Sequence, residues 1–277
     1  DQLKYAVPFG AAGALYGVRV QSDQWVAAAL FPLGMFAAFS IAAVLGPLMN
    51  LFRQSVNHAF LPIMSRRQAS GDIPSMLELN NRGNVIVGAI VFPLFYFAFV
   101  FAGDLVTIVY TAKYLEAVPV IRLYIVGIAA LVIELSSITL LLRQAVFVMS
   151  LNVAALIVAV ALNWYAAVHI GLAGAALGTV TVMYLDRVVT LWRLASLTGV
   201  PIARLQDWKT LGLLALSAVA AASLACGVVA LYFAGSGPVV RVLVGGVTVA
   251  LAYAAIATAT GMSRVWLDTL RNRHHSD

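Results

Sequence analysis

The sequence predicts an all-α integral membrane protein that forms a bundle of about eight transmembrane helices. Hydrophobic residues make up 62% of the 277 residues and charged residues only 10%, whereas soluble domains carry about 25% charged residues. Eight apolar stretches are long enough to cross roughly 30 Å of hydrocarbon as helices. The basic residues gather in alternate connections, which is typical of a chain that crosses a membrane several times.

The predicted spans follow these apolar stretches in order. They cover residues 5–31, 35–64, 76–101, 118–142, 147–168, 172–191, 210–233 and 239–260. The first is expected to be one long helix, because a helix that stopped at Val18 would be only about 21 Å long. Residues 104–117 are expected to form a brief interfacial helix before Pro119. The two spans beyond Pro201 hold almost no charge and are rich in small residues, which predicts peripheral helices.

The distribution of positive charge predicts an orientation. Most of the 17 basic residues fall on one side of the predicted bundle, and only Lys113, Arg122 and Arg241 fall on the other. The positive-inside rule places the more basic side and both ends of the chain in the cytoplasm. Orientation and anionic lipid headgroups therefore explain the net charge of +6, and no nucleic-acid partner is expected.

A polar stripe in the second span is the strongest functional signal. Asn50, Arg53, Gln54, Asn57 and His58 are spaced so that they share one face of a helix whose other residues are largely apolar. An uncompensated arginine is costly in a bilayer, so this face should border a watery passage or a polar ligand. Arginine can hold a phosphate with two parallel hydrogen bonds, and the neighbouring amides suit sugar hydroxyls. The alternative is that Arg53 pairs with an acidic residue to join two helices.

Other ionisable residues lie within the predicted spans. Arg19 and Asp23 are one helical turn apart, so they form either a polar patch with a cation or proton site at Asp23, or a self-neutralising pair. Glu134, in mid-span, is either a coupling-ion or substrate site, or a structural residue that is protonated or paired with an arginine. Asp186 is expected to need a protein partner, whereas Arg187 is expected to extend to the interface.

Two further observations concern helix packing and metals. Asn152 and Asn163 share one helix face and are expected to form interhelical hydrogen bonds. The single cysteine, Cys226, excludes a disulfide framework, and no Cys/His spacing is typical of a zinc site. No metal or other cofactor is therefore expected. Because the chain does not begin with Met and shows no signal-peptide layout, we expect it to be the C-terminal part of a longer protein.

Several segments resemble the C-terminal half of bacterial polysaccharide flippases. In residues 3–71 the resemblance rests on Leu3–Lys4–Tyr5 with Pro8, the buried Asp23, and Leu61–Pro62–Ile63–Met64–Ser65–Arg66 before Gly71. The tract YTAKYLEAVPVIR at residues 110–122 is similar to the family's link between its outer interfacial helix and the next span. Asn152 and Asn163, followed by GLAGAALGT at residues 171–179, are similar to its Asn-rich helix, short turn and Gly/Ala-rich helix start.

The resemblance covers about residues 3–197 and implies a member of the multidrug/oligosaccharidyl-lipid/polysaccharide exporter superfamily. Residues 1–197 would form a six-helix transporter lobe, and residues 198–277 two accessory transmembrane helices with a short cytoplasmic tail. An N-terminal lobe of the same protein would be missing, and without it the central cavity could not be enclosed. The implied setting is the bacterial inner membrane, with membrane lipids and the polysaccharide polymerase machinery as further partners.

The function expected from these observations is the flipping of a lipid-linked, pyrophosphate-bearing oligosaccharide by alternating access, without enzymatic catalysis. Arg53 and Arg19 would attract the phosphates, and Asn50, Gln54, Asn57 and His58 would line the sugar path. Asp23 or Glu134 would bind a coupling proton or sodium ion. A cation-coupled multidrug exporter of the same superfamily is the main alternative. A membrane-embedded glycosyltransferase, which would need a general base or a metal site, and a non-transporting scaffold are the others.

Overall fold

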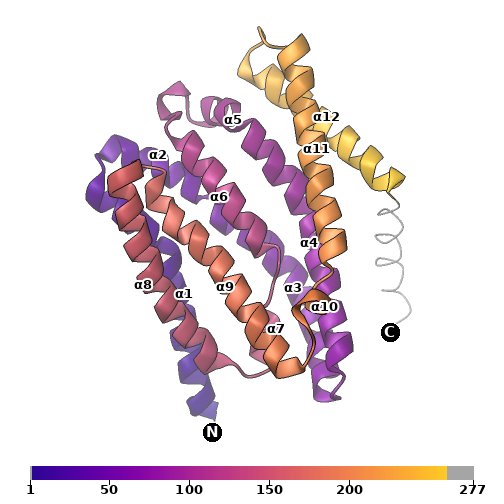
Figure 1. The fold of residues 1–277 in the computed structure, drawn as a ribbon. Coiled ribbons are helices and arrows are strands. Elements are labelled where there is room, and N and C mark those ends of the chain that lie inside the picture. Colours follow the sequence, from indigo (N-terminus) through magenta and orange to yellow (C-terminus); the bar gives the residue numbers. More distant parts are fainter. Residues whose placement is uncertain (1, 261–277) are drawn as a thin grey trace. The chain divides into compact units, whose positions relative to one another are not determined.

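The computed structural model describes residues 2–260, and the predicted all-helical fold is confirmed over this range (Figure 1). No strand occurs among these residues. The elements are α1 (Gln2–Leu30), α2 (Leu33–Ala43), α3 (Leu45–Ala69), α4 (Ile73–Val100), α5 (Ala102–Val109), the 3₁₀ turn η1 (Ala112–Tyr114), α6 (Ala117–Leu131), α7 (Ser136–Leu141), α8 (Ala145–Ile170), α9 (Gly174–Thr198), α10 (Ile202–Leu205), α11 (Trp208–Tyr232) and α12 (Pro238–Ala259).

Each of the eight predicted spans corresponds to one long helix or to two consecutive helices. Within residues 2–260, five helical segments are long and apolar enough to cross a membrane, counting α2 and α3 together as Leu33–Ala69. Helices α1 and α9 are of similar length, with 29 and 25 residues, but have charged side chains in mid-helix. The predicted interfacial helix is found as α5 and η1.

Two predicted spans contain a break. Val44 separates α2 from α3, and Pro47 follows in the first turn of α3, where its lack of an N–H removes a hydrogen bond that a continuous helix would need. Residues 132–135 separate α6 from α7, although they contain neither glycine nor proline. The expectation of one unbroken helix over residues 118–142 was therefore wrong, and Glu134 lies inside the break.

The chain contacts divide the molecule into two compact units, which we describe separately. Unit 1 comprises residues 1–80 and 116–205 and contains α1–α3, the start of α4, and α6–α10. Its most extensive helix pairs are α1 with α8 and α8 with α9, and these helices lie side by side (Figure 1). Helices α8 and α9 approach closely because a Cβ atom at Gly174 or Gly178 would overlap the backbone of α8.

Unit 2 comprises residues 81–115 and 206–277, of which residues up to 260 are described, and it contains most of α4 with α5, α11 and α12. Its core consists of Phe101 and small or branched residues of α11 and α12, namely Ala221, Ala222, Ala225, Val229 and Val249. As expected, α11 packs mainly through small side chains. The functional division at residue 197, into a transporter lobe and accessory helices, stays a prediction.

Candidate substrate cavity

A cavity of about 230 Å³ lies within unit 1, among α1, α3, α7, α8 and α9. Apolar side chains form part of its wall, but its most distinctive feature is a set of charged and polar groups. These are Tyr16, Arg19, Arg53, Ser136, Thr139, Asn152, Asp186, Arg187 and Thr190. The two arginines that the sequence placed on a substrate path, Arg19 and Arg53, therefore line one cavity.

Arg53 is partnered inside this cavity. Its Nη1 atom lies 2.8 Å from Glu134 Oε2, and the two side chains are 12% and 7% exposed. The Nη2 atom of Arg53 also donates a hydrogen bond to Asn50 Oδ1 at 2.9 Å. The ion pair expected as the alternative is observed, and it joins α3 to the α6–α7 break. Arg53 also borders the cavity, and its contact with a substrate stays a prediction.

Glu134 stabilises the break in which it lies. Its Oε1 atom accepts hydrogen bonds from the backbone N–H of Ser136, at 2.7 Å, and from the Ser136 hydroxyl. Its backbone carbonyl accepts a hydrogen bond from Asn80 Nδ2 at 2.9 Å. A helix interruption at membrane depth is tolerated where polar partners satisfy the freed backbone groups, and these contacts supply them. Of the alternatives for Glu134, the arginine-paired arrangement is the one observed.

Arg19 and Arg187 have unused hydrogen-bonding capacity. Arg19 is only 8% exposed, its guanidinium lies over the Tyr16 ring, and its Nη2 atom is 3.6 Å from Asp186 Oδ2. The Nη1 atom of Arg19 and the Nε atom of Arg187 are buried without a hydrogen-bond partner. The structure thus corrects two expectations. Arg19 pairs with Asp186 instead of Asp23, and Arg187 borders the cavity although it was expected to extend to the interface.

Asp23 belongs to a different buried cluster. Its side chain is 1% exposed, and its Oδ2 atom accepts a hydrogen bond from the Tyr124 hydroxyl at 2.6 Å. Its Oδ1 atom accepts one from the backbone N–H of Gln24 at 2.7 Å, and the Thr179 hydroxyl is a further hydrogen-bond partner. Asn163 of α8 bonds the same threonine of α9. Its Nδ2 atom donates to the Thr179 hydroxyl, and its Oδ1 atom accepts from the Thr179 N–H. The interhelical role expected of Asn163 is confirmed.

The polar stripe of α3 is divided by its surroundings. Asn50 and Arg53 are partly buried and bonded to each other, and Asn57 accepts a 2.5 Å hydrogen bond from the Ser137 hydroxyl. Asn57 also lines a second, smaller cavity of about 150 Å³. Gln54 and His58 are exposed on unit 1. The five residues therefore face at least two environments, although helical periodicity placed them on one face.

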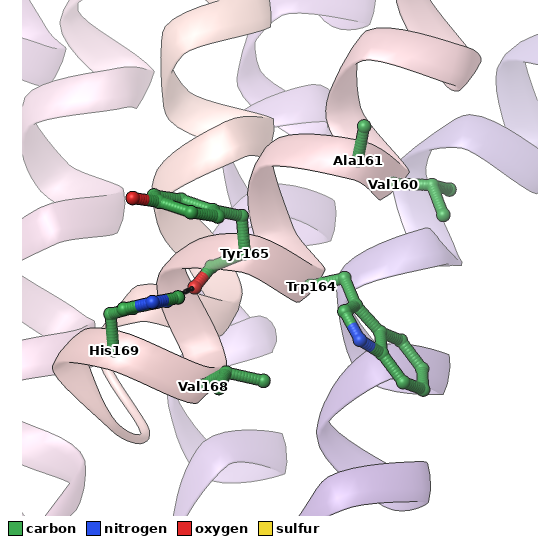
Figure 2. A pocket seen from close by; sticks show the side chains of 6 residues that line it. All are labelled: Val160, Ala161, Trp164, Tyr165, Val168 and His169. Carbon is green, nitrogen blue, oxygen red and sulfur yellow. Dashed lines mark hydrogen bonds between the residues drawn. The ribbon is translucent and has the colours of Figure 1, made fainter.

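A shallow pocket on the surface of α8 lacks these features (Figure 2). Its wall consists of Val160, Ala161, Trp164, Tyr165, Val168 and His169. The rings of Tyr165 and His169 are stacked, with centroids 4.3 Å apart. With no arginine or lysine in its wall, this pocket has no permanent positive charge to attract a phosphate.

Sequence reasoning did not assign Asp186, Arg187, Asn152 or Thr190 to the cavity. The signal was available in part, since Asp186 and Thr190 are four residues apart and share a face of α9. Within residues 2–260, no three His, Cys, Asp or Glu side chains are grouped so that they could hold a metal ion.

Comparison with known proteins identifies the fold. Residues 21–119 match the model of a family described as polysaccharide biosynthesis protein. The chain is similar to the structure of lipid II flippase MurJ in an inward closed conformation, with a TM-score of 0.71 and 14% sequence identity. The match covers 95% of this chain and 55% of the flippase, so the chain spans about half of that protein's length. No curated protein sequence matches the chain. The chain thus has the fold of the lipid II flippase structure, and the family match over residues 21–119 supports the resemblance to polysaccharide flippases found in the sequence.

Proposed function

We propose that the protein flips a lipid-linked, pyrophosphate-bearing oligosaccharide across the bacterial inner membrane for polysaccharide biosynthesis. The fold and the family match support a transporter of lipid-linked substrates rather than a catalyst. Translocation would follow the alternating-access scheme of two-lobed transporters, in which one lobe rocks against another around a central site. Unit 1 would supply one wall of that site, and an N-terminal lobe of the same protein would supply the other.

The observation that carries this proposal is the cavity that Arg19, Arg53 and Arg187 line together. Guanidinium groups at membrane depth are costly unless a counter-charge or water is present, so their convergence indicates a site for an anion. Arginine suits phosphate groups because its planar donors match phosphate oxygens. In this scheme Arg19 and Arg53 attract the pyrophosphate.

The sugar path would run along α3. Asn57 borders the 150 Å³ cavity beside Ser136 and Ser137, which adds hydroxyl groups to the amides of the stripe. Gln54 and His58 are exposed on unit 1 and would meet sugar hydroxyls in the complete passage, together with Asn50.

Coupling to a proton or sodium gradient is assigned to Asp23. Of the two candidates, Glu134 is occupied by Arg53, whereas the partners of Asp23 are a tyrosine hydroxyl, a threonine hydroxyl and one backbone N–H. A carboxylate surrounded by neutral oxygen atoms can accept a proton or a small cation without first breaking an ion pair.

The proposal is tested by replacing Arg53 with Ala in the protein at its native length. We expect loss of surface polysaccharide with protein abundance unchanged, and failure to flip a fluorescent lipid-linked oligosaccharide in proteoliposomes. Arg193→Gln is the matched control, because Arg193 lies outside the cavity and bonds Gln144. Normal flipping by the Arg53→Ala protein would remove Arg53 from the site.

The alternative, a cation-coupled multidrug exporter, would use the same fold. The three arginines of the cavity oppose the binding of a cationic drug by like-charge repulsion. Binding of a cationic dye that competes with protons or sodium, with no flipping of lipid-linked sugar, would favour the exporter instead.

A further inference from the structure

The cavity in unit 1 holds more guanidinium groups than carboxylates to neutralise them. Three arginines, Arg19, Arg53 and Arg187, line it, and the acidic partners in the described structure are Asp186 in the wall and Glu134 beside it. With both carboxylates ionised, one positive charge is left over. At membrane depth such a surplus is unfavourable until an anion binds.

The hydrogen-bond donors without a partner belong to Arg19 and Arg187 rather than to Arg53. Arg53 has a 2.8 Å ion pair with Glu134 and a 2.9 Å hydrogen bond to Asn50. The contact of Arg19 with Asp186 is 3.6 Å, which is longer than a hydrogen bond, and the Nη1 atom of Arg19 is buried without a partner. Arg187 has a buried, unpartnered Nε atom, although its charge is close enough to interact with that of Glu134.

The space beside these donors suits a small anion. The volume of the cavity is about 230 Å³. Typical sites for drug-sized ligands measure about 300–1,000 Å³, so the cavity is too small for a sugar chain. It is large enough for the diphosphate of a larger ligand whose remainder lies outside. Asn152 and Thr190 add neutral hydrogen-bonding groups to the wall.

We infer that Arg19 and Arg187 form a phosphate-binding subsite, in which Asp186 competes with the ligand for Arg19. This inference rests on the proposed function and deepens it, because it names the atoms that hold the diphosphate. Arg19 Nη1 and Arg187 Nε donate to phosphate oxygens, and the weak contact with Asp186 is exchanged for a phosphate contact. Arg53 stays with Glu134 and contributes its charge rather than its hydrogen bonds.

The inference is tested by titrating the purified protein of native length, in detergent, with inorganic pyrophosphate by calorimetry. Hydrogen bonds to a charged group are strong, so Arg187→Gln and Arg19→Gln should each weaken pyrophosphate binding by about tenfold or more. Arg193→Gln should bind like the wild type. Unchanged affinity in a folded Arg187→Gln protein would overturn the inference.

Asp186→Asn provides a test in the opposite direction. It removes the carboxylate that competes for Arg19, so it should tighten pyrophosphate binding severalfold. This variant decides the matter if Arg187→Gln does not fold. Weaker or unchanged binding by Asp186→Asn would then count against a subsite at Arg19 and Arg187.

Two further measurements separate the subsite from the proposed function and identify the source of the phosphate. Pyrophosphate binding that Arg187→Gln abolishes, in a wild-type protein that does not flip lipid-linked sugar in proteoliposomes, would uphold the subsite and refute the proposed function. Flipping by the wild type together with unchanged pyrophosphate binding in Arg187→Gln would do the reverse. Undecaprenyl pyrophosphate should displace inorganic pyrophosphate at a lower concentration than pyrophosphate itself if the ligand is lipid-linked. Equal concentrations would assign the subsite to free diphosphate.

Discussion

The two units of this molecule differ in where they place ionisable residues. Unit 1 buries ionisable groups in its interior, including Arg19, Asp23 and Glu134, and partners most of them across helices. Unit 2 has a core of Phe101 and alanines, and its Asp104–Arg241 ion pair is partly exposed. Small side chains allow helices to pack closely without polar contacts, whereas buried charges require specific partners. The stability of unit 1 should therefore depend more on buried charges than that of unit 2.

The largest effect is expected where this contrast is strongest, at the Arg53–Glu134 pair. Glu134→Ala leaves Arg53 buried without its counter-charge and removes the acceptor of Ser136 N–H. Breaking a buried pair by removing one partner costs about 3–5 kcal/mol. Thermal unfolding in detergent, followed by tryptophan fluorescence, should therefore show a marked loss of stability.

The double variant Arg53→Met/Glu134→Leu is the control for that prediction. It removes both charges, so it should recover much of the stability while still failing to transport. If Glu134→Ala is as stable as the wild type, the pair is dispensable and the distinction between the units weakens.

The next effect concerns close helix packing. A Cβ atom at Gly178 in α9 would overlap the Ala159 carbonyl of α8, and backbone cannot yield easily, so Gly178→Ala should cost about 1–3 kcal/mol. Gly245→Ala in α12 would meet the Phe101 ring, which can turn aside, and should cost less. Gly212→Ala in α11 has open space and should be neutral or slightly stabilising.

The same unfolding measurements rank these three variants. The expected order of destabilisation is Gly178→Ala, then Gly245→Ala, then Gly212→Ala. If Gly245→Ala proved the most damaging, unit 2 would depend on close packing more than unit 1 does.

A smaller effect is expected at the ion pair of unit 2. The side chains of Arg241 and Asp104 are 34% and 19% exposed, and Arg241 Nη2 lies 2.5 Å from Asp104 Oδ1. Exposed pairs contribute about 0–1 kcal/mol, so Asp104→Asn should lower stability by that amount at most, and salt should reduce the difference further. A loss as large as that of Glu134→Ala would show that charge matters equally in both units.

The fold was largely predictable because the spans depend on local hydrophobicity. Helices α4 and α8 begin and end within three residues of the predicted limits. The α6–α7 break was not predictable in this way, since no proline or glycine marks it. The Asn80 amide, the Ser136 N–H and Arg53 together stabilise it, and these contacts form only when distant helices pack.

The candidate site was predictable in its residue types but not in its pairing. Periodicity placed Arg53 on a polar face, yet periodicity alone cannot choose among Glu134, Asp23 and water as its neighbour. Arg19 has a potential partner four residues away at Asp23, but the fold brings Asp186 of α9 closer. Arg187 was assigned to the interface from its depth along a predicted span, and depth does not reveal that a cavity lies beside it.

The smallest expected effect concerns a charge outside the spans, at Asp72 before α4. Its carboxylate accepts a 3.1 Å hydrogen bond from Ser75 N–H and lies 3.7 Å from Arg67. The Ser75 hydroxyl, the Ser75 N–H and Arg67 lower the pKa of Asp72 below its ordinary value of 3.8. A carboxylate whose pKa is lowered by folding stabilises the folded state above its unfolded pKa, and this contribution is lost as the pH falls through its folded pKa.

Asp72→Asn should therefore be slightly less stable than the wild type at neutral pH, and the difference should shrink as the pH falls below about 5 and vanish below the folded pKa of Asp72. Unfolding temperatures of both proteins across this pH range provide the measurement. Because Asp72 and Arg67 are solvent-exposed, added salt should also remove the difference. A difference that survives both acid and salt would mean that the substitution acts through contacts other than the charge of Asp72.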